Sequence, residues 1–277
     1  MITMQTHSFP RDPRLWLPLL VVLVWSVVAL LAPLWGLAPN AVDLSAILAP
    51  PGPRAVLGND DLGRSVLDRL LVGARTSLVV GLGVVGVSAL LGALVGGIAG
   101  FAGGRVDLVL SRVIDCFLAF PGILLAIALA GVLGPGIGNV IIALAVVGWV
   151  GYARLTRAQV LSLAGRDHVQ AARALGRGPV AILRLHLVPL ALAPLIVEAT
   201  FGVSGAVVAE AGLSFLGLGV QPPDPSWGSL MRDGVAYLLV APHLVIAPGV
   251  AILLVVLSVN LLGDWLRDWL DVRTRPG

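Results

Sequence analysis

Residues 166–189 read Arg-Asp-His-Val-Gln-Ala-Ala-Arg-Ala-Leu-Gly-Arg-Gly-Pro-Val-Ala-Ile-Leu-Arg-Leu-His-Leu-Val-Pro and form a basic segment between two long apolar stretches. The alanines and the leucine of its first half favour a short helix. Gly176, Gly178 and Pro179 then break the direction of the chain. A membrane protein that keeps such a segment on one face of the bilayer is expected to present it to a partner. The alternative is a passive loop whose arginines only set the orientation in the membrane.

The apolar stretches on either side are typical of the whole chain. Of its 277 residues, 58% are hydrophobic and only 12% are charged, and the mean hydropathy is +0.99. Soluble domains contain about 25% charged residues on average. So few charges could not cover the surface of a soluble protein of this size. The composition therefore predicts an all-α, polytopic membrane protein with one membrane domain.

Six segments are apolar over about the 20 residues that a helix needs to cross the hydrocarbon core. We expect transmembrane helices at 15–37, 77–101, 113–133, 137–155, 187–213 and 238–262. The fourth has the weakest pattern, because Gly148, Trp149 and Gly151 interrupt it. Residues 77–265 would form the core of the membrane domain.

The 18 basic residues are all arginines, and they are distributed unequally over this six-span arrangement. With the N-terminus inside, thirteen of the 18 lie in cytoplasmic segments and five in outer segments. This positive-inside bias predicts that residues 1–14, the loop 158–189 and the tail 266–277 are all cytoplasmic. The arginines do not cluster on a face with stacking aromatic side chains, so nucleic-acid binding is not expected.

Two outer segments are too long to be simple turns. Segment 38–76 begins with prolines and glycines and ends in an amphipathic stretch, 64–75, that we expect to be a helix lying in the membrane interface. Segment 214–237 contains Gln-Pro-Pro-Asp-Pro-Ser-Trp-Gly at 221–228, which cannot form a regular helix. We expect an ordered, partly re-entrant loop there, because irregular backbone at membrane depth must be buried in protein or line a cavity.

Small and acidic residues inside the spans predict close contacts and polar sites. Gly92, Gly96 and Gly100 share one face of the second span, which predicts a close helix contact with another subunit or inside this chain. Glu198 and Glu210, the only glutamates, both lie at the fifth span. Each is either a proton or cation site or a hydrogen-bonded structural group near a pore. In the third span, Asp115 follows Arg112 by three residues and is expected to pair with it.

The sequence does not contain the residues that several classes of enzyme and metal site require. The chain contains no lysine, so it has no Walker A phosphate-binding loop and cannot be an ATPase of that class. Its four histidines are scattered and its single cysteine, Cys116, lies in an apolar run, so we expect neither a metal site nor a bound cofactor. Because no nucleophile–base or paired-carboxylate arrangement occurs at usable spacing, we do not expect an enzyme.

A series of short strings occurs in a fixed order along most of the chain, from 57 to 271. They include Gly58-Asn-Asp-Asp-Leu-Gly-Arg64, Gly73-Ala-Arg-Thr-Ser-Leu78, Ala102-Gly-Gly-Arg-Val-Asp107 and Asn260-Leu-Leu-Gly-Asp264. The most specific ones are Glu210-Ala-Gly-Leu-Ser-Phe-Leu-Gly-Leu-Gly219, Gln221-Pro-Pro223 and Ser226-Trp-Gly228. Together with the spacing of Ala-Ala, Gly and Pro in the basic segment, they resemble the second permease subunit of the peptide/nickel class of ABC importers. This subunit is the "C" partner of dipeptide and oligopeptide permeases.

The resemblance implies the type I ABC-importer architecture and half of a translocation pore for di- or oligopeptides in a bacterial inner membrane. The implied partners are a homologous permease subunit, two cytoplasmic ABC ATPases that bind ATP and Mg, an extracytoplasmic solute-binding protein and the lipid bilayer. The loop that couples to the ATPases would include Asp167, Val169, Gln170, Ala171, Ala172, Arg173, Leu175, Gly176, Arg177 and Pro189. The pore or its outer loop would include Glu198, Glu210, Ser214, Phe215, Pro222, Pro223 and Trp227.

Three residues of the coupling loop carry specific expectations. Gln170 stands where the family usually has Glu, so docking on an ATPase is expected without a charged contact at this position. Ala172 is small enough for a partner surface to close over it. Gly176 is expected to adopt a conformation that residues with a β-carbon disfavour.

Two alternative functions remain open. The cargo of such an importer could be nickel or another small solute. A different class is a self-sufficient channel or secondary transporter, which commonly shows internal repeats. We find no internal repeat in this chain.

Overall fold

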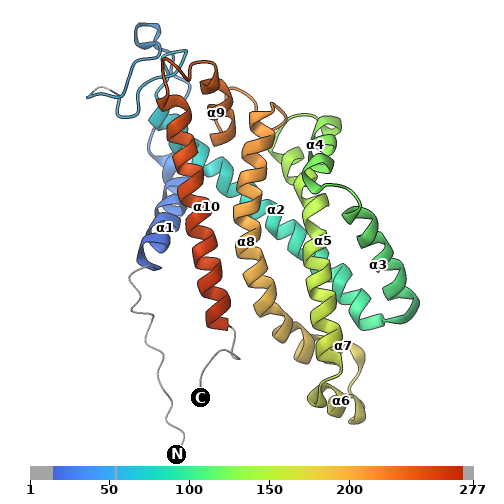
Figure 1. The fold of residues 1–277 in the computed structure, drawn as a ribbon. Coiled ribbons are helices and arrows are strands. Elements are labelled where there is room, and N and C mark those ends of the chain that lie inside the picture. Colours follow the sequence, from blue (N-terminus) through green and yellow to red (C-terminus); the bar gives the residue numbers. More distant parts are fainter. Residues whose placement is uncertain (1–14, 54, 271–277) are drawn as a thin grey trace, which may run out of the picture.

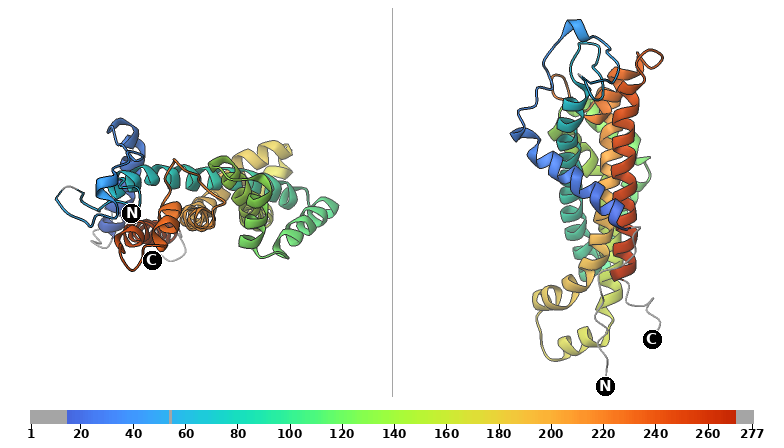
Figure 2. Two further views of the ribbon diagram at one scale, coloured as in Figure 1. Left: turned by 90° about the horizontal axis from the view of Figure 1, so that it is seen from above. Right: turned by 90° about the vertical axis from the view of Figure 1, so that its left-hand side faces the viewer.

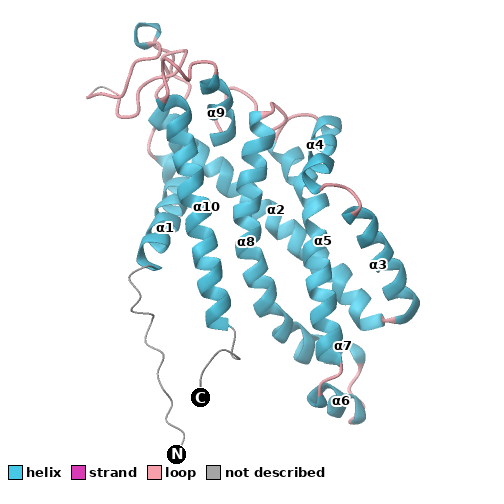
Figure 3. Ribbon diagram, in the orientation of Figure 1, coloured by secondary structure: helices cyan, strands magenta, loops and turns pink. Residues whose placement is uncertain are grey.

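The computed structural model describes residues 15–53 and 55–270, and within them the regular elements are helices and no β-strand forms (Figure 1, Figure 3). The predicted all-α fold is confirmed. The helices are α1 (Trp16–Leu31), α2 (Val66–Ala102), α3 (Gly104–Leu118), α4 (Gly122–Leu133), α5 (Ile137–Ala164), α6 (Asp167–Ala174), α7 (Pro179–Ile182), α8 (Val188–Phe215), α9 (Trp227–Val235) and α10 (His243–Leu270). Short turns η2 (Ala32–Leu34) and η3 (Leu44–Ala46) and the π-helical turn η4 (Leu183–Leu187) complete the set.

Five helical stretches are long and apolar enough to cross a membrane, or up to six if a bent pair counts as one span. They are α1 with η2, α2, α5, the continuous run Pro179–Phe215, and α10. The sixth predicted span lies later than expected, because Pro242 precedes the first turn of α10 and the helix continues to Leu270. Residues 1–14 and 271–277, for which a cytoplasmic location is predicted, lie outside the described residues.

The third predicted span, 113–133, is not one continuous helix. It is divided between α3 and α4, which are bent by 84° at the break. Pro121 caps α4, and a residue that precedes proline is disfavoured in the helical conformation. The carboxylate of Asp107 holds α3 against α5, because the Arg157 Nη2 donates to its Oδ2 at 2.7 Å.

The expected interfacial helix at 64–75 is also different in the structure. These residues lead directly into the second span, and α2 runs unbroken from Val66 to Ala102. The Ser65 Oγ caps it by accepting from the Asp68 backbone N–H at 3.3 Å. The leucines of this stretch are half-buried on the first turns of α2 and do not form a separate helix on a surface.

Helix α2 crosses obliquely behind α10, α8 and α5 (Figure 1), and seen from above it runs along one side of the row that they form (Figure 2). Its glycines face α5 within this chain. A Cβ at Gly92 would lie 2.5 Å from the Trp149 carbonyl oxygen, and one at Gly96 would overlap the Ala153 carbonyl oxygen. Of the two expectations for this glycine face, packing inside the chain is the one observed.

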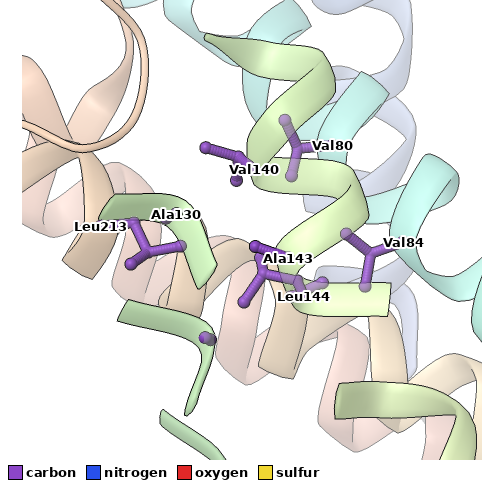
Figure 4. Packing of buried hydrophobic residues seen from close by; sticks show 9 residues of the cluster. Val80, Val84, Ala130, Val140, Ala143, Leu144 and Leu213 are labelled. Carbon is purple, nitrogen blue, oxygen red and sulfur yellow. The ribbon is translucent and has the colours of Figure 1, made fainter. Parts of the chain in front are cut away.

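The fourth span, predicted to be the weakest, is a central helix of the bundle. Small residues let α5 approach its neighbours closely, since Ala143, Ala145 and Ala153 are almost fully buried. The core cluster in Figure 4 joins α5 (Val140, Ala143, Leu144) to α2 (Val80, Val84), α4 (Ala130) and α8 (Leu213).

Candidate functional site

The basic segment forms a compact helical unit at one end of the bundle (Figure 1). After α6, Gly176 has φ +77°, which confirms the expected left-handed conformation. The Gly176 N–H donates to the Arg173 carbonyl at 2.9 Å, and the Arg177 N–H donates to the Ala172 carbonyl at 3.0 Å. This pair of hydrogen bonds is the Schellman pattern that ends a helix at a glycine. The chain then enters α7 and continues through η4 into α8.

The unit has an apolar core of its own, and this core corrects the expectation for Ala172. Val169 is fully buried and Ala172 is only 7% exposed, both packed with Val160, Leu163, Ile182 and Leu187. Ala172 is small because the helix packs against the rest of this chain at that point. No partner is needed to close over it.

The exposed residues of the basic segment form the surface that remains available for a partner. Leu175 is 85% exposed and Val180 and Leu185 are also exposed, in a segment that contains exposed arginines as well. Next to it, Val180, Leu185 and Arg184 line a hollow of about 740 Å³. The remaining predicted coupling residues, Asp167, Gln170, Ala171, Arg173, Gly176, Arg177 and Pro189, are exposed as well.

Gln170 has a structural partner within the chain. Its Nε2 donates to the Ala164 carbonyl at 3.1 Å and so ties α6 to the end of α5. A glutamate at this position could not donate that hydrogen bond. The amide therefore replaces a charged exposed group with a contact between the basic segment and the end of α5.

We expect Gly176→Ala to loosen the end of α6, because φ +77° disfavours a side chain with a Cβ by about 1–2 kcal/mol. Gly178→Ala is the matched control: no atom would lie within 4 Å of its Cβ, and the backbone there has φ −66°. Hydrogen exchange of the α6 amides, followed by mass spectrometry, should accelerate in the first variant only. Equal exchange in both variants would contradict the assigned role of Gly176.

At the opposite end of the bundle (Figure 1), the predicted re-entrant loop is ordered and anchored to α2 and α8. The Ser214 Oγ donates to the Glu210 Oε1 at 2.6 Å and accepts from the Val220 N–H at 3.2 Å. The Trp227 Nε1 donates to the Leu70 carbonyl at 3.0 Å. Glu210, Ser214 and Trp227 are buried in the chain, whereas Phe215, Pro222 and Pro223 are exposed.

The two glutamates of the fifth span have different surroundings. Glu210 is fully buried and accepts a hydrogen bond from Ser214, which lies next to the outer loop. Of the two roles expected for it, the hydrogen-bonded structural group is the one observed. Glu198 is exposed on α8 and lines a cavity of about 360 Å³ between α2, α4, α5 and α8. The structure therefore separates these two residues instead of joining them in one site.

Two other pairs of polar side chains lie close together in the structure, one of which was expected. The Arg112 Nη1 lies 3.5 Å from the Asp115 Oδ2, as predicted, and both side chains are exposed. The rings of His168 and His186 are 5.9 Å apart, although His168 lies in α6 and His186 lies in η4. In the part of the chain that the structure describes, no three His, Cys, Asp or Glu side chains are grouped so that they could hold a metal ion.

Residues 92–276 match the family described as "Binding-protein-dependent transport system inner membrane component". The chain belongs to this family. It is thus a multi-pass permease component of an inner membrane, as its apolar helices also indicate. The resemblance drawn from the short sequence strings is confirmed.

Relatives of this permease align with nearly its whole length. It is 44% identical over 235 residues to the di/tripeptide transport system permease protein DppC of Pseudomonas aeruginosa, which covers 83% of this chain and 78% of that protein. It is 37% identical over 264 residues to the dipeptide transport system permease protein DppC of Haemophilus influenzae, with coverage of 93% and 90%. With the glutathione transport system permease protein GsiD of Pectobacterium atrosepticum it shares 38% identity over 238 residues, 86% of this chain and 79% of that protein.

A solved structure has the same fold. A chain of the inward-facing MetNI methionine ABC transporter superposes with a TM-score of 0.57 at 21% sequence identity, covering 73% of the permease and 96% of that chain. The expected importer-permease architecture is confirmed by this likeness.

One polar residue beside Glu198 received no role from the sequence. Tyr152, one of two tyrosines in the chain, lines the same cavity from α5. It lies in the middle of an apolar span, and a phenol at such a depth normally has a hydrogen-bond partner. A tyrosine at this position in the sequence could have indicated a polar site inside the span. Its neighbour in the cavity, Glu198, could not have been predicted in the same way, because it is 46 positions away along the chain.

Proposed function

We propose that this permease forms one half of the translocation pore of an ATP-driven importer of di- or oligopeptides. The observation that carries the proposal is the exposed carboxylate of Glu198 in a membrane-spanning helix. A charged side chain there is unfavourable against lipid, so this face requires a water-filled path or another subunit. The peptide cargo rests on the relatives at 37–44% identity that are named for di- and tripeptide transport.

The proposed complex contains a homologous permease, two cytoplasmic ABC ATPases and an extracytoplasmic solute-binding protein. ATP and Mg bind to the ATPases, and this chain binds no cofactor and catalyses no reaction. Both of its termini and the basic segment lie in the cytoplasm, following the distribution of arginines. The exposed apolar residues beside Leu175 suit docking on an ATPase, because such patches mark interaction surfaces. The ordered outer loop lies near the docked binding protein.

Reconstitution tests this function. The permease, its sister permease, the ATPases and the binding protein are placed in liposomes, and ATP-dependent uptake of dialanine is measured. We expect uptake by the full complex only. Selective transport or ATP hydrolysis by this subunit alone would contradict the proposal and favour a self-sufficient transporter. Uptake of nickel but not of dialanine would change the cargo and leave the importer class in place.

A further inference from the structure

Three polar residues line the cavity between α2, α4, α5 and α8. Its walls are mostly Val, Ala, Gly, Ile and Leu, and the polar residues among them are Ser88, Tyr152 and Glu198. The volume, about 360 Å³, lies at the small end of the range of sites for small molecules. Each of the three side chains can offer an oxygen as a hydrogen-bond acceptor.

The hydroxyl of Tyr152 is a buried polar group without a partner. The side chain is 5% exposed, and its oxygen makes no hydrogen bond to any described residue. Helix α8 comes close to it at Gly202, where a Cβ would overlap the hydroxyl oxygen. A buried hydroxyl without a partner is unfavourable, and native proteins rarely retain one without a reason. A bound ligand would supply the missing partner.

The carboxylate of Glu198 lies against α5 and lines the same cavity as Tyr152. A Cβ at Gly151, the residue before Tyr152, would be 3.8 Å from the Glu198 Oε1. Glu198 is ten residues after Val188, so it lies about 15 Å along α8, at the rise of an α-helix. Ser88 approaches α5 one turn away from Tyr152, since a Cβ at Gly148 would be 2.7 Å from its Oγ.

We propose that this cavity binds the ammonium group of the transported solute, with Glu198 as its counter-ion and the oxygens of Tyr152 and Ser88 as further acceptors. An ammonium group has three N–H donors and no acceptor, which matches these three oxygens. A single carboxylate is too small a ligand set for a metal ion.

A peptide with free ends also has a carboxylate at its C-terminus, and a cationic side chain lies near Glu198. Glu198 borders a second cavity of about 510 Å³, which Arg267 lines from α10. A negative and a positive side chain thus lie beside adjoining cavities, as the two charged ends of a zwitterion require. This assignment rests on the proposed function only in naming a peptide as the bearer of the ammonium group.

Ligand-detected NMR on the assembled complex, purified without the binding protein, tests the ammonium site. The probes are methylammonium, dialanine and N-acetyl-dialanine, which has no ammonium group. We expect the first two to bind and the acetylated peptide to bind at least about tenfold more weakly. Glu198→Gln should weaken methylammonium and dialanine by about tenfold, as expected for the loss of a charge-assisted contact.

Two further variants separate binding from folding. Tyr152→Phe should weaken both amines by about threefold with an unchanged melting temperature, because the hydroxyl has no partner to lose. Asp115→Asn removes an exposed carboxylate outside the cavity and should leave binding unchanged. Equal binding of methylammonium by the wild type and Glu198→Gln would overturn the assignment, as would equal binding of the acetylated peptide.

The outcome is distinguishable from that of the proposed function. If methylammonium binding depends on Glu198 and the complete complex does not import dialanine, the ammonium site stands and the peptide cargo is wrong. If dialanine is imported and ammonium binding is independent of Glu198, the importer stands and the site is wrong.

Discussion

Gly96→Ala is expected to destabilise the helix bundle by about 1–3 kcal/mol or more, the range for overpacking a tight interior. The added methyl group would overlap the backbone carbonyl of Ala153, and a backbone atom cannot rotate away as a side chain can. Helices α2 and α5 would have to separate along their whole contact. The measurement is the melting temperature of the purified protein in detergent, together with the amount of monodisperse protein recovered.

Gly86→Ala is the matched control for this prediction. Gly86 lies on the same helix, is exposed, and has no atom within 4 Å of the position of a Cβ. Alanine there should be neutral or slightly stabilising, since it favours a helix more than glycine does. A melting temperature that falls equally in both variants would mean that glycine at 96 is not required by the contact with α5.

Leu175→Asp is expected to reduce recovery of the ATPases with the permease by at least about tenfold, as for loss of an interface hot spot. The side chain of Leu175 is 85% exposed in the chain alone, so the substitution should leave the fold unchanged. Its effect arises only if a partner covers this surface, because a buried aspartate without a counter-charge is unfavourable. Affinity purification of the complex through this subunit measures it, with ATP hydrolysis as a second readout.

Leu239→Asp provides the comparison at the opposite end of the molecule. Leu239 is 98% exposed and lies in the turn between α9 and α10, far from the basic segment (Figure 1). It should not change recovery of the ATPases. Full recovery of the ATPases with Leu175→Asp would place their docking surface elsewhere on the chain.

Local chemistry explains which structural features could be predicted. Gly176, followed by Gly178 and Pro179, marks the end of α6 because only glycine adopts the required conformation easily. The composition identified the apolar spans because backbone groups in a bilayer must bond within a helix. The break between α3 and α4 was not predicted from the composition, although Pro121 lies at that break.

Features that depend on distant contacts could not be predicted in this way. The burial of Ala172 follows from the return of the chain through α7 and η4, which forms a small core below α5. The position of Glu198 beside Tyr152 follows from the packing of α8 on α5. An apolar helix with few polar residues has no clear polar face, so its pattern does not specify which neighbour each face contacts.

The path from the basic segment into the membrane contains no loop. Residues Pro179–Phe215 form one helical stretch through α7, η4 and α8. A flexible linker would absorb a displacement of α7, whereas a continuous helix transmits it along its axis. The stretch can bend where its regular pattern changes, at the wide turn η4 and at Pro194. Both points come before Glu198, so the length of α8 beyond them, including Glu210 and the attached outer loop, would move as a single lever.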